Sequence, residues 1–254
     1  MIRDVWKENF DDEMCRIHFL MFSHHVMVID TEFPGFLRNT PRDAYEEQRY
    51  EDLKFNVDRM ELIQLGFALC DERGEIGAVW QFNFSNFDPV TDVHVPASIQ
   101  LLRKNGIDLE KNLQEGVDVC VFAEHLKKIM SVHHRLQWIT FHGLYDLAYL
   151  LKMLSEKKEL PDSLPQFAKI AGDVFGSVYD VKFMARYCNG LMGGELGLER
   201  LAKILDIERV GEAHQAGSDC LLTAHVFFHM KEIYNLSDDM FQVLMLVGNI
   251  PING

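Results

Sequence analysis

The clearest element in the pattern of apolar and polar residues is a buried strand at Val26–Ile29, where four apolar residues stand in a row. Before it, apolar side chains recur at helical spacing over residues 9–22, which predicts a helix that leads into the strand. After it, residues 38–60 are charged and rich in turn formers, which predicts a surface loop or a short helix. The chain is therefore expected to begin with a helix, a buried strand and a polar connection.

Two strand-like runs follow at residues 61–70 and 75–84, separated by the turn sequence DERG. Together they predict an antiparallel hairpin. Residues 98–130 carry a largely helical pattern that is interrupted near Gly106 and Gly116. We therefore expect the hairpin to be followed by several short helices.

The second half of the chain alternates between strand and helix patterns. Residues 136–141 predict a second buried strand, which runs into an apolar helix at residues 142–154. A loop is predicted at residues 161–165, where a proline stands at each end, and a short fifth strand is predicted at residues 177–181. Residues 196–234 predict two helices around a glycine-containing loop.

Three strands followed by helix, strand, helix, strand and helix is the order of a ribonuclease H-like α/β domain. Such a domain has a mixed sheet of five or six strands flanked by helices. Other α/β folds permit similar orders, so the order alone leaves the fold open. No linker, repeat or low-complexity tract divides the sequence, and we expect one domain over residues 1–254.

Composition narrows the class of protein. Hydrophobic residues make up 48% and charged residues 25%, as in ordinary soluble domains. The apolar runs are far shorter than the roughly 20 residues that span a bilayer, and the charged N-terminus lacks the core of a signal peptide. We expect an intracellular protein that makes no membrane contact. Five scattered cysteines without a C-x-x-C pair indicate neither a disulfide framework nor structural zinc.

The net charge of −14 disfavours a protein that grips long stretches of duplex nucleic acid. It leaves open the binding of a short single-stranded end, where a local site sets the potential. The candidate chemistry therefore depends on particular residues.

Asp30 and Glu32 follow the first buried strand, separated by Thr31. Alternate side chains on a strand share a face, so the two carboxylates are expected to lie close together and to repel unless something neutralises them. Two solvated acids at a strand end are the alternative interpretation. A hydrophobic strand that ends in two acids on one face is, however, what a metal site at a sheet edge requires.

Asp146 comes just after the second buried strand, near the start of the apolar helix. The positive end of the helix dipole would stabilise an acid there without any further role. Its neighbours Leu147, Leu150 and Leu151 nevertheless predict a buried turn. A buried acid needs a partner.

His214 and Asp219 are five residues apart, which on one continuous helix would place them about 140° from each other. They converge only if His214 lies in the loop before the helix, and Gly211 and Gly217 favour such a loop. A surface histidine followed by a first-turn acid is the alternative.

Taken together, D-x-E, a later isolated Asp and H-x-x-x-x-D resemble the DEDDh superfamily of 3′-to-5′ exonucleases. The histidine subtype is indicated because Gln215, four residues before Asp219, is not the tyrosine of the sister subtype. The stretches MVIDTEFPG, FHGLYDLAYLLKML, VYDVKFM and RVGEAHQAGSDCLLTAHVFF resemble the catalytic deadenylase of the Pop/Caf ribonuclease family, the carbon catabolite repressor-associated factors. The resemblance extends over nearly the whole chain. One departure is HGLYD, where many members have HSGYD, and it leaves the fit around the terminal nucleotide open.

The resemblance implies a 3′-to-5′ exoribonuclease that shortens poly(A) tails, releases AMP and uses two Mg²⁺ or Mn²⁺ ions about 4 Å apart. Asp30, Glu32 and Asp219 would hold one ion. Asp30 would bridge to a second ion that Asp146 also holds. His214 would accept the proton of the attacking water.

Two further residues are candidates for substrate binding. Phe33 follows the acid pair and would stack on or wedge beside the terminal base, or else cap the core. His142 is a second candidate to line the same groove.

The resemblance also implies binding partners and a cellular location. The partners would be single-stranded poly(A) RNA, the scaffold subunit of the Not complex and a leucine-rich-repeat deadenylase, in the cytoplasm and nucleus. Two alternative functions stay open: a DEDDh exonuclease of general RNA or DNA 3′ ends, and a scaffold subunit of the deadenylase complex. The presence of all five catalytic positions disfavours the scaffold, because a pseudo-enzyme has no physical reason to keep a repelling acid cluster.

Overall fold

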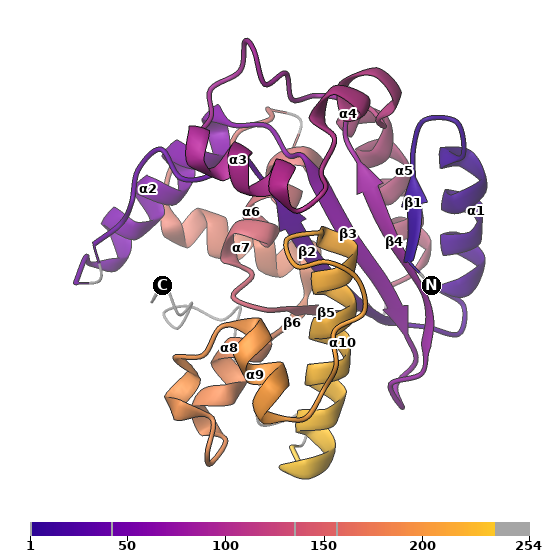
Figure 1. Ribbon diagram of the computed structural model, residues 1–254, viewed down its shortest axis with the longest axis vertical. Helices are drawn as coiled ribbons and strands as arrows, with labels where there is room; N and C mark the ends of the chain where they lie inside the picture. The colour runs from indigo at the N-terminus through magenta and orange to yellow at the C-terminus, as the bar shows by residue number, and fades with distance from the viewer. Residues whose placement is uncertain (1, 42, 135, 156, 237–254) are drawn as a thin grey trace.

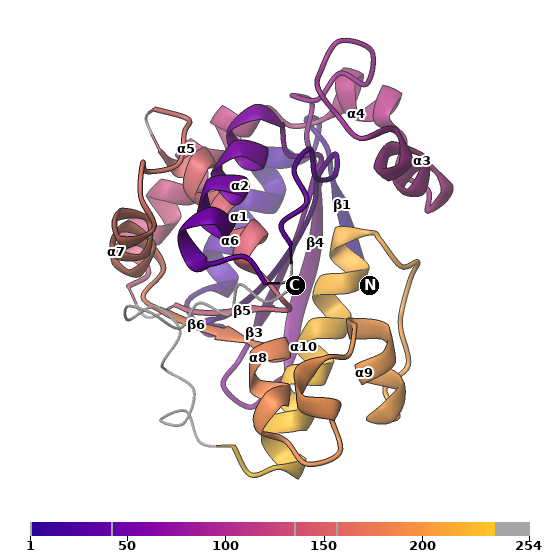
Figure 2. The same cartoon turned by 90° about the vertical axis from the view of Figure 1, so that its left-hand side faces the viewer.

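A mixed six-stranded sheet forms the centre of the protein, with helices packed against both faces (Figures 1 and 2). The structure is a computed structural model that describes residues 2–41, 43–134, 136–155 and 157–236. The spatial order of the strands is β1-β4-β3-β2-β5-β6. The strands are β1 Ile2–Val5, β2 Val26–Glu32, β3 Gln64–Cys70, β4 Ile76–Asn83, β5 Gln137–Thr140 and β6 Ser177–Asp180.

Strand direction changes across the sheet. β2, β3 and β4 form an antiparallel meander, whereas β5 and β6 run parallel to β2, and β1 runs parallel to β4. The carboxyl ends of β2, β5 and β6 therefore meet at one edge, as expected of parallel strands joined by helices. This edge is where the acids of the sequence analysis lie.

The helices form two layers. In Figure 2, α1, α2, α5, α6 and α7 lie on one side of the sheet and α8, α9 and α10 on the other. The helices are α1 Phe10–Leu20, α2 Glu46–Arg59, α3 Pro96–Lys104, α4 Leu109–Glu115, α5 Val119–Val132, α6 Leu144–Leu154, α7 Leu164–Phe175, α8 Val181–Met184, α9 Leu198–Ile204 and α10 Ala216–Ile233.

The continuous apolar run before Asp30 is explained by these two layers. Met27 and Ile29 pack into the core under α1 and α6, and Val26 and Val28 pack into the core under α10. A strand covered on both faces has no need of alternating polar residues. β2 is therefore a rigid central strand that ends in the two acids.

Most of the predicted elements are confirmed, with three differences. The loop predicted at residues 161–165 is wrong at its end, because Pro165 lies in the first turn of α7, where its missing N–H has no intrahelical partner to lose. The polar stretch 38–60 contains the 14-residue helix α2. The edge strand β1 was not predicted, since four residues with two charges give too weak a pattern. Within the described residues, no helix combines the length and the apolar character needed to cross a membrane.

α10 starts in direct contact with the sheet. A Cβ at Gly66 of β3 would lie 1.9 Å from the carbonyl oxygen of Ala216, the first residue of α10. The side-chain oxygens of Gln64 and Gln81 accept the N–H groups of Ala216 (3.4 Å) and Gly217 (3.0 Å). Sheet glutamines thus satisfy amides that a helix start leaves free, and they fix where α10 begins.

We expect Gly66→Ala to destabilise the protein by about 1–3 kcal/mol or more, because backbone atoms of α10 must move to admit the methyl group. Gly197→Ala is the matched control: a Cβ there meets no atom within 4 Å and its φ of −76° suits alanine. Its expected cost is only that of a less favourable N-cap of α9, about 1 kcal/mol or less. Urea unfolding of both variants measures the difference. Equal destabilisation would show that α10 is not seated on β3 at Gly66.

Candidate active site

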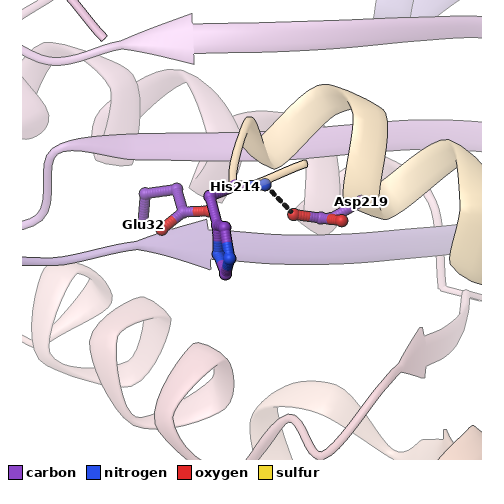
Figure 3. Close-up of side chains that lie close together, drawn as sticks. All are labelled: Glu32, His214 and Asp219. Carbon is purple, nitrogen blue, oxygen red and sulfur yellow. Dashed lines mark hydrogen bonds between the residues drawn. The ribbon is translucent and has the colours of Figure 1, made fainter. Parts of the chain in front are cut away.

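Four acids from three elements gather at the carboxyl end of β2. Asp30 and Glu32 end the strand, Asp146 lies in the first turn of α6, and Asp219 lies in the first turn of α10. Ligand atoms of Glu32, Asp219 and His214 all lie within 4.8 Å of one another (Figure 3). The charges of Asp146, Asp219 and Glu32 all act on Asp30, so the structure brings the five predicted residues together.

The cluster is electrostatically costly. Burial raises the pKa of Asp30 well above its usual range, and the charges of the other three acids raise it further. Burial, with Asp219 and Asp146 nearby, raises the pKa of Glu32 to about 8. At neutral pH, protons therefore remain on part of the cluster in the absence of another cation.

Asp146 is the most deeply placed acid, with 6% of its surface exposed. Its Oδ1 accepts a hydrogen bond from the hydroxyl of Thr31, the residue between the two acids of β2. Burial raises the pKa of Asp146 to about 7, although hydrogen bonds from Thr31 oppose the rise. Asp146 thus has the partner that a buried acid requires.

His214 lies in the loop before α10, as the spacing from Asp219 predicted. Its backbone N–H donates to Oδ2 of Asp219 at 2.9 Å, and in Figure 3 its exposed imidazole lies between Glu32 and Asp219. The φ of His214 is 58°, in the left-handed region that residues other than glycine seldom adopt. Such strain is typical of functional positions.

Arg209 is a site residue that was not predicted from the sequence. Its Nη1 donates to Oδ1 of Asp219 at 2.6 Å, and its Nε donates to Glu199 of α9 at 2.8 Å. The charge of Arg209 also lowers the pKa of Asp30, against the effect of the acids. Two features of the sequence could have indicated Arg209. A cluster of acids needs a nearby cation, and Arg209 belongs to the same predicted loop between helices as His214.

A cleft of about 460 Å³ opens beside Asp30 and Asp146. Its wall includes both predicted substrate-binding residues, Phe33 and His142. Phe33 stacks on Tyr145 with ring centroids 5.3 Å apart and packs against the core, as the core-capping interpretation predicts. Its stacking on a terminal base stays a prediction.

Phe36 also belongs to this wall, and its ring is more exposed than that of Phe33, with 43% of the residue's surface accessible. It meets both Phe33 and Tyr145 edge-on. Phe36 was not predicted as a site residue, because it lies beyond Pro34 and Gly35, outside the D-x-E motif.

The donor set fits divalent cations. Four carboxylates supply the oxygen ligands that Mg²⁺ and Mn²⁺ prefer. Burial, together with the charges of neighbouring acids, raises the pKa of Asp30 and of Glu32. A cation bound to them would displace protons and relieve repulsion.

We expect Asp30→Asn to raise the melting temperature of the metal-free protein, by about 2–4 °C for each kcal/mol of repulsion removed. The pKa of Glu32 rises on folding from 4.5 to about 8. Its contribution to stability is therefore present below pH 4.5 and is lost as the pH rises through about 8. Melting in EDTA between pH 5 and 9 should show wild-type stability falling with pH, with a smaller fall in the variant. A large loss of stability in Asp30→Asn would instead make Asp30 a structural hydrogen-bonding group.

The sequence matches the CAF1 family ribonuclease over residues 5–138 and 121–227. A CCR4-associated factor 1 homolog (homolog 1) of Arabidopsis thaliana is 43% identical over 92% of this chain, and the chain spans 65% of the length of that relative. The poly(A) ribonuclease pop2 of Schizosaccharomyces pombe is 39% identical over 92% of this chain and 70% of its own length.

Solved structures show the same fold. S. pombe Pop2p, in a form with Mg²⁺ and Mn²⁺ bound, has a TM-score of 0.86 and 37% identity, and the match covers 95% of this chain and 97% of that one. Yeast CAF1, co-crystallised with the NOT1 MIF4G domain, has a TM-score of 0.78 and 27% identity, with 92% and 90% covered. The predicted ribonuclease H-like exonuclease architecture is confirmed. On sequence and fold alike, the chain belongs to the CAF1 family of ribonucleases.

Proposed function

We propose that the protein is a metal-dependent 3′-to-5′ exoribonuclease that shortens poly(A) tails and releases AMP. The observation that carries the proposal is the convergence of Asp30, Glu32, Asp146, Asp219 and His214 in a chain of this ribonuclease family. The name of the S. pombe relative, a poly(A) ribonuclease, supports poly(A) as the substrate.

The four acids would hold two divalent cations, Mg²⁺ or Mn²⁺. The metal-bound form of S. pombe Pop2p supports this assignment. When bound, the cations polarise the scissile phosphate and favour deprotonation of the attacking water. Asp30, at the end of β2, would contribute ligand oxygens for both cations. Thr31 holds Asp146 through a hydrogen bond from its hydroxyl.

His214 would be the general base. Its imidazole is exposed, lies within 4.8 Å of Glu32 and Asp219 ligand atoms, and belongs to a loop rather than to the helix. Among side chains, histidine acts most often as the general acid or base of a hydrolytic reaction.

The cleft beside Asp30 would hold the 3′-terminal nucleotide. It joins the acid cluster at one end and presents the rings of Phe33, Phe36 and Tyr145. Aromatic rings hold single strands by stacking, which does not depend on a basic surface. The net charge of −14 is therefore compatible with a short single-stranded substrate.

The proposed partners are a Not scaffold subunit and a leucine-rich-repeat deadenylase, in the cytoplasm and nucleus. The complex of yeast CAF1 with the NOT1 MIF4G domain supports the first partner. The description of relatives as CCR4-associated factors supports membership of the same assembly.

The direct test is a 5′-labelled RNA that ends in a run of adenosines, beside one that ends in mixed bases. With Mg²⁺ we expect a ladder of products shortened one nucleotide at a time, AMP as the released product, and faster removal of adenosines. Excess EDTA should abolish the reaction and added Mg²⁺ or Mn²⁺ should restore it. Full activity in EDTA would defeat the metal assignment, and equal rates on the two RNAs would defeat the poly(A) preference.

For His214→Ala we expect hydrolysis to slow about 10²–10⁴-fold, because the general base is removed. Metal affinity should stay nearly unchanged, because His214 is not a metal ligand in this proposal. The residual rate should rise more steeply with pH, since hydroxide must replace the imidazole. Single-turnover kinetics and calorimetric metal titration measure the two effects. His134→Ala is the matched control, an exposed histidine before the amino end of β5. Lost metal binding would make His214 a ligand, and an unchanged rate would make it a bystander.

A further inference from the structure

Arg209 occupies a fixed position beside the acid cluster. It lies in the loop between α9 and α10, and only 14% of its side chain is exposed. Besides Asp219, its guanidinium contacts Glu199 through Nε at 2.8 Å and the hydroxyl of Ser218 through Nη1 at 3.1 Å. The Ser218 hydroxyl in turn donates to the carbonyl of Val210 at 2.9 Å. Arg209 is thus tied to α9, to its own loop and to α10.

The Asp219 carboxylate receives one donor on each oxygen. Oδ1 accepts from Arg209 at 2.6 Å, and Oδ2 accepts from the backbone N–H of His214 at 2.9 Å. Two donors from one loop prevent the carboxylate from rotating. An ionised carboxylate has about four lone-pair positions, so both oxygens keep room for a cation.

We infer that Arg209 is a positioning residue for metal binding: it holds the Asp219 carboxylate in the orientation that a divalent cation meets. The inference rests on the proposed function in taking Asp219 as a metal ligand. Partners of metal ligands that orient them in this way commonly change metal affinity about 10–100-fold when they are removed.

Position and charge predict opposite effects on metal affinity. If Arg209 acted only through its charge, its removal would leave the acids more negative and would tighten the binding of a dication. If it acts through orientation, its removal weakens binding. Lysine separates the two further, because it keeps the charge but lacks the planar fork of donors.

The experiment is calorimetric titration of metal-free protein with Mn²⁺, without RNA, together with melting curves in EDTA. We expect Mn²⁺ affinity to fall about 10–100-fold in Arg209→Met and to fall also in Arg209→Lys. Glu199→Gln is the matched control: it removes the half-exposed partner of Arg209, leaves the contact to Asp219, and should change the affinity less than about fivefold. If Arg209→Met does not fold, Arg209→Lys carries the same test.

Tighter or unchanged Mn²⁺ binding in folded Arg209 variants overturns the inference, even if they melt at lower temperature. In that case Arg209 neutralises charge or anchors the loop. An absence of Mn²⁺ binding by the wild-type protein overturns the proposed function, and the inference falls with it. Normal wild-type binding with weakened binding in both Arg209 variants, but not in Glu199→Gln, establishes the positioning role.

Discussion

Repulsion among four carboxylates at one strand end is the constraint on which the site depends. Burial raises the pKa of Asp146 to about 7, and burial with Asp219 and Asp146 nearby raises the pKa of Glu32 to about 8. These acids oppose folding at neutral pH, so the scaffold around them must hold them in place. The protein meets this demand with buried and closely packed segments. β2 is buried on both faces, Asp146 is held from β2 by Thr31, and α10 is seated against β3 at Gly66.

The parts of this arrangement that could be predicted from sequence are those set by local periodicity. Alternation along a strand places Asp30 and Glu32 on one face whatever the fold. The 3.6-residue period of a helix excludes His214 and Asp219 from one continuous helix, which required the loop that the structure shows. The family was identified from the amino-acid sequence around these residues, and the match to the model of the CAF1 family ribonuclease agrees with it.

The rest depends on contacts between distant segments, which periodicity does not encode. Arg209 is ten residues from Asp219, and nothing in its neighbours shows that its guanidinium turns toward the acids. Thr31 reaches Asp146 across 115 positions of the chain. The sequence around Gly66 predicts only a strand, and the need for a glycine there follows from the contact with α10. Phe36 belongs to the cleft wall together with Tyr145, a residue of α6 that its ring meets edge-on.

The loop between α9 and α10 joins the two halves of the proposed chemistry. It carries Arg209, which fixes one oxygen of Asp219, and His214, whose backbone fixes the other and whose side chain would move the proton. Its geometry has a cost, since His214 is held at positive φ and Gly211 adopts a φ of 92°. Because orientation of the metal ligand and placement of the base share one backbone, a displacement of this loop disturbs both. Gln64 of β3 and Gln81 of β4 hold the first turn of α10 through its N–H groups. Because the loop ends where α10 begins, these two glutamines also fix the end of the loop that carries Arg209 and His214.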